Sequence, residues 1–133
     1  MRKKLLTHSV LNKSATNRED LYKICRSFGL RNTKIEFARN FSPRYERMIL
    51  NLGNPISGGS HWVAVDNVNK RYFDPFGMNP PTYIPKDYEW TPLSIQNINY
   101  GHCGQYCCLF LYYSKMNEID KLYNLFEIGS MGV

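Results

Sequence analysis

Apolar residues recur three and four positions apart in two amphipathic stretches of the chain. The first lies between Asn17, a residue type that caps helix starts, and Gly29, a residue type that ends helices. The second follows Asn117, which we predict to be its N-cap, and its apolar residues continue to Phe126. Each pattern predicts a helix that packs one face against a core. We expect residues 129–133 to form a frayed tail.

A third stretch, from Cys103 to Met116, contains no residue that breaks a helix. Positions 107–113 are apolar or aromatic on every face, which is typical of a helix that is buried on all sides. We therefore predict a central helix that is wrapped by a sheet and by the other helices. Gly104 lies in its first turn and has no side chain, so another backbone could come close to it.

Short apolar runs with strand character lie between these helices. They span residues 35–38, 47–52, 61–66, 71–76 and 93–98. The order of these elements, with one helix first, strands in the middle and two helices last, predicts an α+β domain. Its central sheet, mixed or antiparallel, is expected to pack on the buried helix.

The runs 61–66 and 71–76 are separated by four residues, which predicts an antiparallel hairpin. If Asp66 lies opposite Arg71, Val63 lies opposite Asp74, and His61 is one diagonal away on the same face. This register would bring an imidazole and a carboxylate together. A shift by one residue would put them on opposite faces of the sheet.

Length and composition fit one domain over residues 1–133, which we expect to be monomeric. With 43% hydrophobic residues the chain can fill a core. Its charge is uneven, because residues 1–50 carry 12 Lys and Arg against 4 Asp and Glu, whereas residues 51–133 carry 5 against 7. The basic half suggests an acidic partner such as DNA, and a solvated basic face is the alternative. Residues 1–16 form a basic, polar lead-in that we expect to be mobile.

Four cysteines, two of them adjacent, do not make a disulfide framework for a chain of 133 residues. They favour a reducing compartment. The N-terminus opens like a signal peptide, but polar residues between Thr7 and Lys13 interrupt any apolar core. Since no apolar run approaches the ~20 residues that span a bilayer, we expect a soluble, intracellular protein without membrane contact.

Cys103 is the strongest candidate for a nucleophile because it lies at the polar start of a predicted helix. Unpaired N–H groups and the helix dipole at that position favour a thiolate. A cysteine nucleophile needs a base, a group that orients the base, and donors for the oxyanion. His61 can be the base, Asp74 can orient it, and Gln96 with the Cys103 backbone N–H can hold the oxyanion.

Each of these assignments has an alternative. Most free cysteines are small buried apolar residues, as we expect for Cys107 and Cys108. His102 is adjacent to Cys103, but neighbouring side chains on a helix or tight turn point apart, so His61 is the better base. His8 lies in the lead-in. A zinc site made of Cys103, Cys107 and His102 would lack a second ligand pair at the usual spacing.

Four short features carry a further signal. Residues 58–62 read Gly-Gly-Ser-His-Trp, and residues 73–77 read Phe-Asp-Pro-Phe-Gly. Residues 103–110 read Cys-Gly-Gln-Tyr-Cys-Cys-Leu-Phe, and Gln96 stands seven residues before Cys103. In this order they resemble the motifs of the adenain-type family, the maturation cysteine proteases of adenoviruses, which has smaller relatives in virophages.

The resemblance implies His61 as base, Asp74 as its orienting group, Cys103 as nucleophile, and Gln96 with the Cys103 amide as oxyanion hole. It implies a papain-like fold with the catalytic order permuted to His, Asp, Cys. The expected substrates are viral capsid or core precursor proteins cut after glycine during virion maturation, in the virion and the interior of the host cell. The chemistry would need no cofactor, although DNA or a peptide could activate the enzyme.

The chain also departs from adenain, because only 30 residues follow Cys103 and no cysteine lies between Asp74 and Gln96 to tether an activating peptide. Alternative functions therefore stay open. The same triad would serve an isopeptidase that removes ubiquitin-like modifiers, or an acyltransferase. From another class, the chain could be a catalytically inert, basic DNA-binding virion protein.

Overall fold

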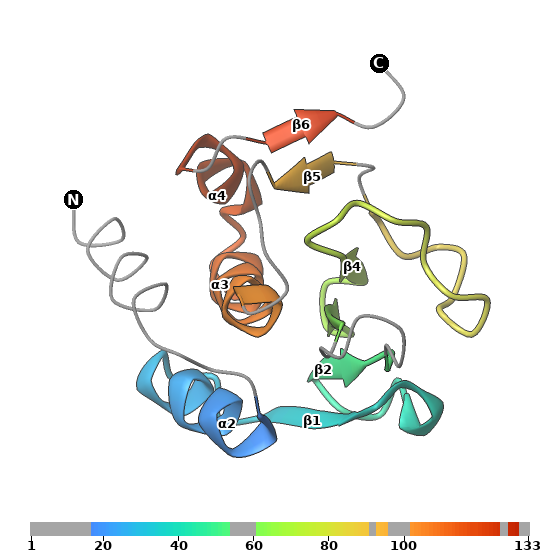
Figure 1. Cartoon of the computed structure of the whole chain (residues 1–133), viewed down its shortest axis with the longest axis vertical. Coiled ribbons are helices and arrows are strands. Elements are labelled where there is room, and N and C mark those ends of the chain that lie inside the picture. The colour runs from blue at the N-terminus through green and yellow to red at the C-terminus, as the bar shows by residue number, and fades with distance from the viewer. Residues whose placement is uncertain (1–16, 54–60, 91–92, 96–101, 126–127, 131–133) are drawn as a thin grey trace.

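Four short strands form one mixed sheet in the computed structural model, which describes residues 17–53, 61–90, 93–95, 102–125 and 128–130 (Figure 1). The strands are β1 (Thr33–Phe37), β2 (Arg47–Asn51), β3 (Trp62–Asp66) and β4 (Arg71–Phe73), in that order across the sheet. The pair β1–β2 is parallel, and the pairs β2–β3 and β3–β4 are antiparallel. With helices on one face of this sheet, the fold is α+β, as predicted.

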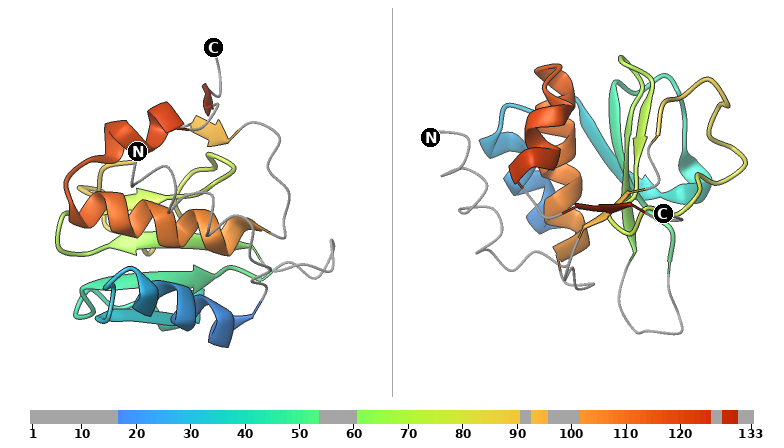
Figure 2. Two further views of the ribbon diagram at one scale, coloured as in Figure 1. Left: turned by 90° about the vertical axis from the view of Figure 1, so that its left-hand side faces the viewer. Right: turned by 90° about the horizontal axis from the view of Figure 1, so that it is seen from above.

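Side chains alternate across the sheet and build two cores. Ile49, Ala64 and Phe73 face the helices, whereas Val63 and Tyr72 belong to a second apolar cluster on the other face. That second cluster is completed by residues from the long segment after β4, so the molecule has three layers: helices, sheet and this segment (Figure 2). Both faces of the short strands are thereby buried.

The predicted register of the β3–β4 hairpin is confirmed. Asp66 pairs with Arg71, and Ala64 pairs with Phe73. The second strand ends at Phe73 rather than at residue 76, because the Asp-Pro pair that follows cannot continue the ladder. The Asp66 carboxylate is fully buried and accepts the N–H groups of Val68 and Asn69, each at 3.0 Å, so it closes the loop of the hairpin.

The helix α3 (Cys103–Lys115) occupies the centre of the molecule, as predicted (Figure 1). Ten of its residues are buried, and it packs on β3 and β4 on one side and on the helices α2 (Arg18–Ser27) and α4 (Ile119–Leu125) on others. In α2 the Asn17 side chain accepts the Asp20 N–H at 2.8 Å, which confirms the predicted N-cap. Gly29 ends α2 with a φ of +73°.

Asn117 does not cap α4, so that prediction is wrong. It ends α3 instead, with a φ of +56° and its N–H donating to the Ser114 carbonyl at 2.9 Å, while Glu118 N–H donates to Tyr113 at 2.8 Å. These two bonds are a Schellman motif, in which asparagine can replace the usual glycine. Because only three residues separate the two helices, the one asparagine is used at the end of the first.

The predicted frayed tail is also corrected. Residues Ile128–Ser130 form the strand β6, which pairs antiparallel with β5 (Leu93–Ile95), and residues 131–133 lie outside the described part of the chain. The lead-in 1–16 and the remainder of the predicted strand 93–98 also lie outside it. Among the described residues, none of the helices has the length and apolar character that crossing a membrane requires.

Replacing Gly104 by alanine should destabilise the fold. A Cβ there would lie 2.5 Å from Leu21 Cδ2 and 3.1 Å from Cδ1, and Leu21 is fully buried. Overpacking of this kind costs about 1 to 3 kcal/mol, against a gain of about 1 kcal/mol from the better helix propensity of alanine. Urea unfolding should therefore show a lower free energy of unfolding. The variant Leu21→Ala should remove the clash. The double variant Leu21→Ala/Gly104→Ala should therefore lose less free energy of unfolding than the sum of the losses in the two single variants. Equal or higher stability of Gly104→Ala would contradict the packing described.

Candidate active site

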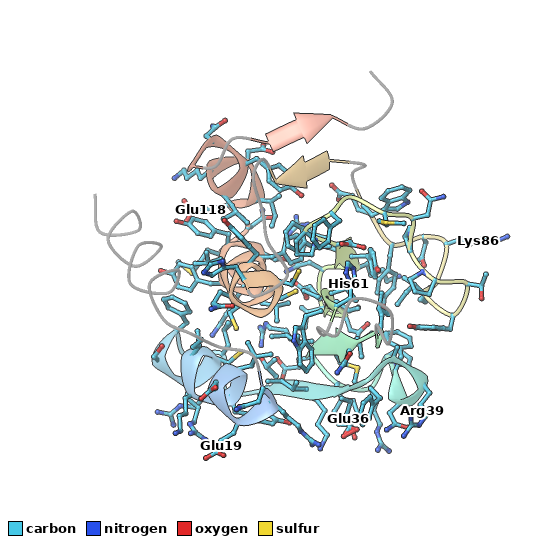
Figure 3. All side chains as sticks on the ribbon, in the orientation of Figure 1. Glu19, Glu36, Arg39, His61, Lys86 and Glu118 are labelled. Atoms are coloured by element: carbon cyan, nitrogen blue, oxygen red, sulfur yellow. The ribbon has the colours of Figure 1, made fainter. Side chains whose placement is uncertain are left out.

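His61 and Asp74 form the hydrogen-bonded pair that the hairpin register predicts. His61, labelled in Figure 3, has its Nε2 3.0 Å from Asp74 Oδ2, and both side chains are largely buried. The imidazole ring also stacks on Phe76, with ring centroids 5.4 Å apart and an angle of 25° between the planes. A base held by a carboxylate on one edge and an aromatic ring on one face has a fixed orientation.

The turn after β4 fixes Asp74 itself. Its second carboxylate oxygen, Oδ1, accepts the Phe76 N–H at 2.8 Å, and its carbonyl accepts the Gly77 N–H at 2.8 Å. Gly77 has a φ of +71°, which only glycine adopts without strain. The motif Asp-Pro-Phe-Gly thus serves to end the strand and to aim one oxygen at His61. Sequence reasoning did not find the role of Phe76, although its place two residues after Asp74 is typical of such an Asx-type turn.

Cys103 is the first residue of α3, as predicted, and its side chain is fully buried. Its sulfur accepts the backbone N–H of Trp62, the residue that follows His61, and it lies within the field of the Asp74 carboxylate. The structure therefore brings the N-terminal end of α3 to the same end of the hairpin as His61 and Asp74. The residue before the helix, His102, occupies the N-cap position without a side-chain capping bond.

The expectation that the helix start favours a thiolate is wrong for the isolated thiol. Burial, and next the negative charge of Asp74, raise the pKa of Cys103 from 9.0 to about 12, although the Trp62 N–H acts in the opposite direction. That rise corresponds to about 4 kcal/mol, whereas a helix terminus contributes about 0.3 to 2 kcal/mol. Cys103 on its own is therefore a neutral thiol at pH 7.

Other predicted participants are only partly placed. Gln96 and His8 lie outside the described residues, so the structure does not test their roles. Cys107 and Cys108 are fully buried free thiols, as expected. Within the described part of the chain, no group of three or more His, Cys, Asp and Glu side chains is arranged to hold a metal ion.

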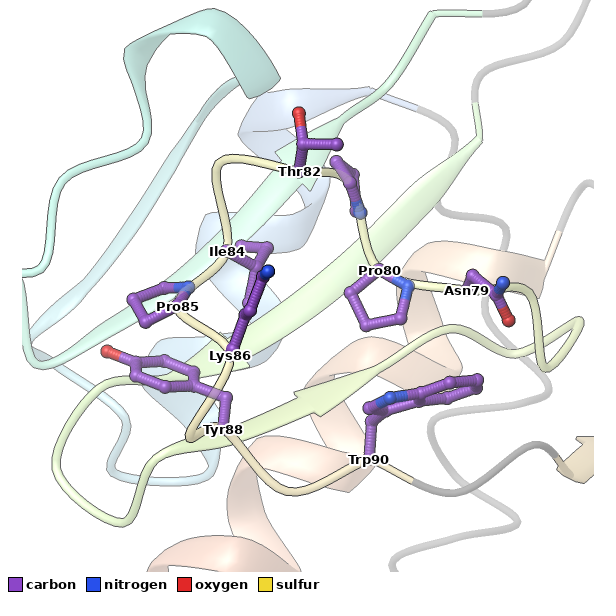
Figure 4. A pocket seen from close by; sticks show the side chains of 9 residues that line it. Asn79, Pro80, Thr82, Ile84, Pro85, Lys86, Tyr88 and Trp90 are labelled. Atoms are coloured by element: carbon purple, nitrogen blue, oxygen red, sulfur yellow. The ribbon is translucent and has the colours of Figure 1, made fainter.

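Two pockets are found beside the sheet, one at β1 to β3 and one in the segment after β4. One of about 240 Å³ is lined by Trp62, by Asn51 at the end of β2, and by β1 residues including Phe37. Another, of about 330 Å³, lies in the segment after β4 and is lined by residues 79–82, 84–86, Tyr88 and Trp90 (Figure 4). His61, Asp74 and Cys103 line neither of these two pockets.

The raised pKa of Cys103 predicts how alkylation depends on pH when the base is missing. In His61→Phe, which retains a ring against Phe76, the alkylation rate of Cys103 should rise about tenfold per pH unit up to pH 10 without a plateau. Adding Asp74→Asn should increase the rate at every pH below the pKa, because the neutral amide removes the repulsion that disfavours the thiolate. Mass spectrometry of iodoacetamide-treated protein would follow Cys103, with buried Cys107 as the internal reference. A plateau below pH 9 would show that the helix start dominates.

Comparison of the chain with protein-family models, with curated proteins and with solved structures gives no significant match. The geometry of His61, Asp74 and Cys103 is therefore the structural observation that bears on function.

Proposed function

We propose that the chain is a cysteine endopeptidase in which Cys103 is the nucleophile, His61 the base and Asp74 the group that orients the base. The observation that carries this proposal is the 3.0 Å bond between His61 and Asp74 next to a buried cysteine at a helix start. Isolated, each residue type is common. Together they supply a nucleophile, a base and an orienting group, which is the requirement for acyl transfer by a thiol.

The bond from Nε2 to the carboxylate assigns the roles of the two ring nitrogens. When the Nε2–H donates to Asp74, Nδ1 is the nitrogen that can accept the Cys103 proton. The sulfur then adds to the scissile carbonyl carbon, and the resulting oxyanion receives hydrogen bonds. Collapse of this intermediate breaks the C–N bond, and the imidazolium gives its proton to the leaving amine. Water, deprotonated by His61, then hydrolyses the thioester and frees Cys103.

The oxyanion would be held by the Cys103 backbone N–H at the start of α3 and by the amide of Gln96. The first N–H groups of a helix have no partner within it, so the Cys103 N–H has the right place for this role. Gln96 is assigned from its spacing to Cys103 and from the resemblance to the adenain-type family. The same resemblance, together with a central helix packed on a sheet and the order His61, Asp74, Cys103, supports a papain-like fold with permuted catalytic residues.

The substrate class follows from the family resemblance. We propose that the enzyme cleaves after glycine in viral capsid or core precursor proteins, in the virion or the infected cell, without a cofactor in the chemistry. The motifs around His61, Asp74 and Cys103 support this specificity through their resemblance to the adenain-type family and its fold relatives, which typically cut after glycine because their cleft is too narrow for a side chain there.

Removing the Cys103 thiol should abolish peptide hydrolysis. We expect Cys103→Ala to lose all thiol-dependent turnover of peptides with a Gly-Gly bond, and Asp74→Asn to lose about 10² to 10⁴-fold in kcat/KM by misorienting His61. The matched control is Cys107→Ala, because Cys107 lies one helical turn after Cys103 and is equally buried. The folded Cys107→Ala protein should keep its activity. Cleavage would be measured with fluorogenic peptides, and folding by circular dichroism.

Turnover that survives Cys103→Ala would overturn the proposal. Ubiquitin-like conjugates tested beside linear peptides would separate an isopeptidase from an endopeptidase. A chain that binds DNA tightly and cleaves neither would be the inert virion protein instead.

DNA is proposed as a partner of the basic half. Lys34 and Arg44 lie over the Tyr45 ring, at 5.9 and 5.0 Å from its centroid, and Arg39 lies over Phe37 at 4.7 Å. Cations set among aromatic rings along β1 and the residues that follow it suit phosphates and unstacked bases. This favours single-stranded over double-stranded DNA.

Neutralising these cations should weaken DNA binding and its dependence on salt. In each of the variants Arg39→Ala and Arg44→Ala, the slope of the logarithm of the DNA association constant against the logarithm of the salt concentration should become shallower by about 0.7. Lys86→Ala, on the segment after β4, is the control and should leave the slope unchanged. Fluorescence anisotropy with a labelled oligonucleotide at several salt concentrations measures both quantities. Equal slopes for all three variants would contradict binding at this surface.

A further inference from the structure

Two thiols that the proposed chemistry does not use lie in contact inside the helical layer. Cys25 Sγ of α2 and Cys108 Sγ of α3 are 3.5 Å apart, although 83 positions separate them in the sequence. Both side chains are buried, at 1% and 0% exposure, and both are free thiols. All four cysteines are described, and this is the pair for which the structure gives a contact between sulfurs.

The packing of α2 on α3 explains why these sulfurs meet. Leu21 lies against Gly104, and Cys25 lies against Cys108, so the contacts advance by four residues along both helices in the same direction. The two helices therefore run side by side and parallel at this seam (Figure 2). The missing side chain of Gly104 permits the close approach, and one helical turn later the facing positions hold two cysteines.

We propose that Cys25 and Cys108 form a redox modification site, a dithiol that is converted to an intramolecular disulfide by a peroxide-class oxidant. One thiolate attacks the O–O bond of the peroxide, which gives a sulfenic acid and releases an alcohol or water. The second sulfur attacks the sulfenic sulfur and displaces water. The two thiols lose two protons and two electrons in total, and the peroxide is reduced by two electrons.

The geometry is close to that of the product. A disulfide has sulfurs about 2.05 Å apart, so the pair must approach by about 1.5 Å, which small χ rotations and a slight shift of α2 can supply. The hydrogen bond with Cys25, and next burial, raise the pKa of Cys108. Because little thiolate forms and the site is covered, the reaction is slow compared with that of an exposed thiol.

The product would tie α2 covalently to the helix that carries Cys103. The cross-link closes a loop that contains β1 to β5, and it removes much of the conformational freedom of the unfolded chain. This inference does not depend on the proposed peptidase activity. It applies equally to an inert chain, since neither Cys25 nor Cys108 takes part in the proposed mechanism.

The test is oxidation of the folded, full-length protein with hydrogen peroxide, followed by non-reducing peptide mapping. Trypsin places Cys25 in residues 24–26 and Cys108 in residues 87–115, so we expect one cross-link between these two peptides and a mass lower by two hydrogens. The oxidised monomer should have a thermal midpoint higher by roughly 10 °C, and dithiothreitol should reverse this shift.

Residues 87–115 also contain Cys103 and Cys107, so single variants are needed to identify which cysteines form the cross-link. The cross-link should persist in Cys103→Ala and Cys107→Ala and disappear in Cys25→Ala and Cys108→Ala. In Gly104→Ala, which pushes the helices apart, it should form several-fold more slowly. A cross-link that depends on Cys103 or Cys107, disulfide-linked dimers, or no cross-link in the wild-type chain would each overturn the proposal. The wild-type result does not require any variant to fold.

Discussion

The register of the β3–β4 hairpin is the constraint on which the rest of the structure depends. It is set at the loop by the buried Asp66 carboxylate, which accepts two backbone N–H groups and the Asn69 side chain, and also the hydroxyl of Ser114 on α3. Arg71, opposite Asp66, donates to the same serine. A buried carboxylate without such donors would cost several kcal/mol, so a slipped hairpin would lose both its loop and its hold on α3.

One hairpin thereby fixes both ends of the central helix. At the loop end it binds Ser114 in the last turn of α3, and at the open end the backbone of Trp62 meets the sulfur of Cys103 in the first turn. Asp74 is the first residue after β4, and its side chain makes a hydrogen bond with His61, the residue before β3. Since α3 packs on both strands of the hairpin, packing sets the position of Cys103, while the turn after β4 places Asp74 against His61.

Features governed by local patterns or by strand alternation could be predicted from the sequence, and those governed by contacts between distant residues could not. Because side chains alternate along paired strands, His61 and Asp74 could be predicted to share one face of the hairpin. The apolar residues on every face of α3 indicated that it is buried. Asn117 was misassigned because asparagine suits both helix ends, and only the three-dimensional path decides between them. The Asp66–Ser114 contact joins residues 48 positions apart, and no local pattern signals it.

Cys103 has to lose its proton before it can act as a nucleophile, and burial and the charge of Asp74 make the lone thiolate unfavourable by about 4 kcal/mol. In the proposed mechanism, the positive charge that His61 gains when it takes the Cys103 proton would have to offset this cost. Under this proposal Cys103 would stay protonated until His61 takes its proton.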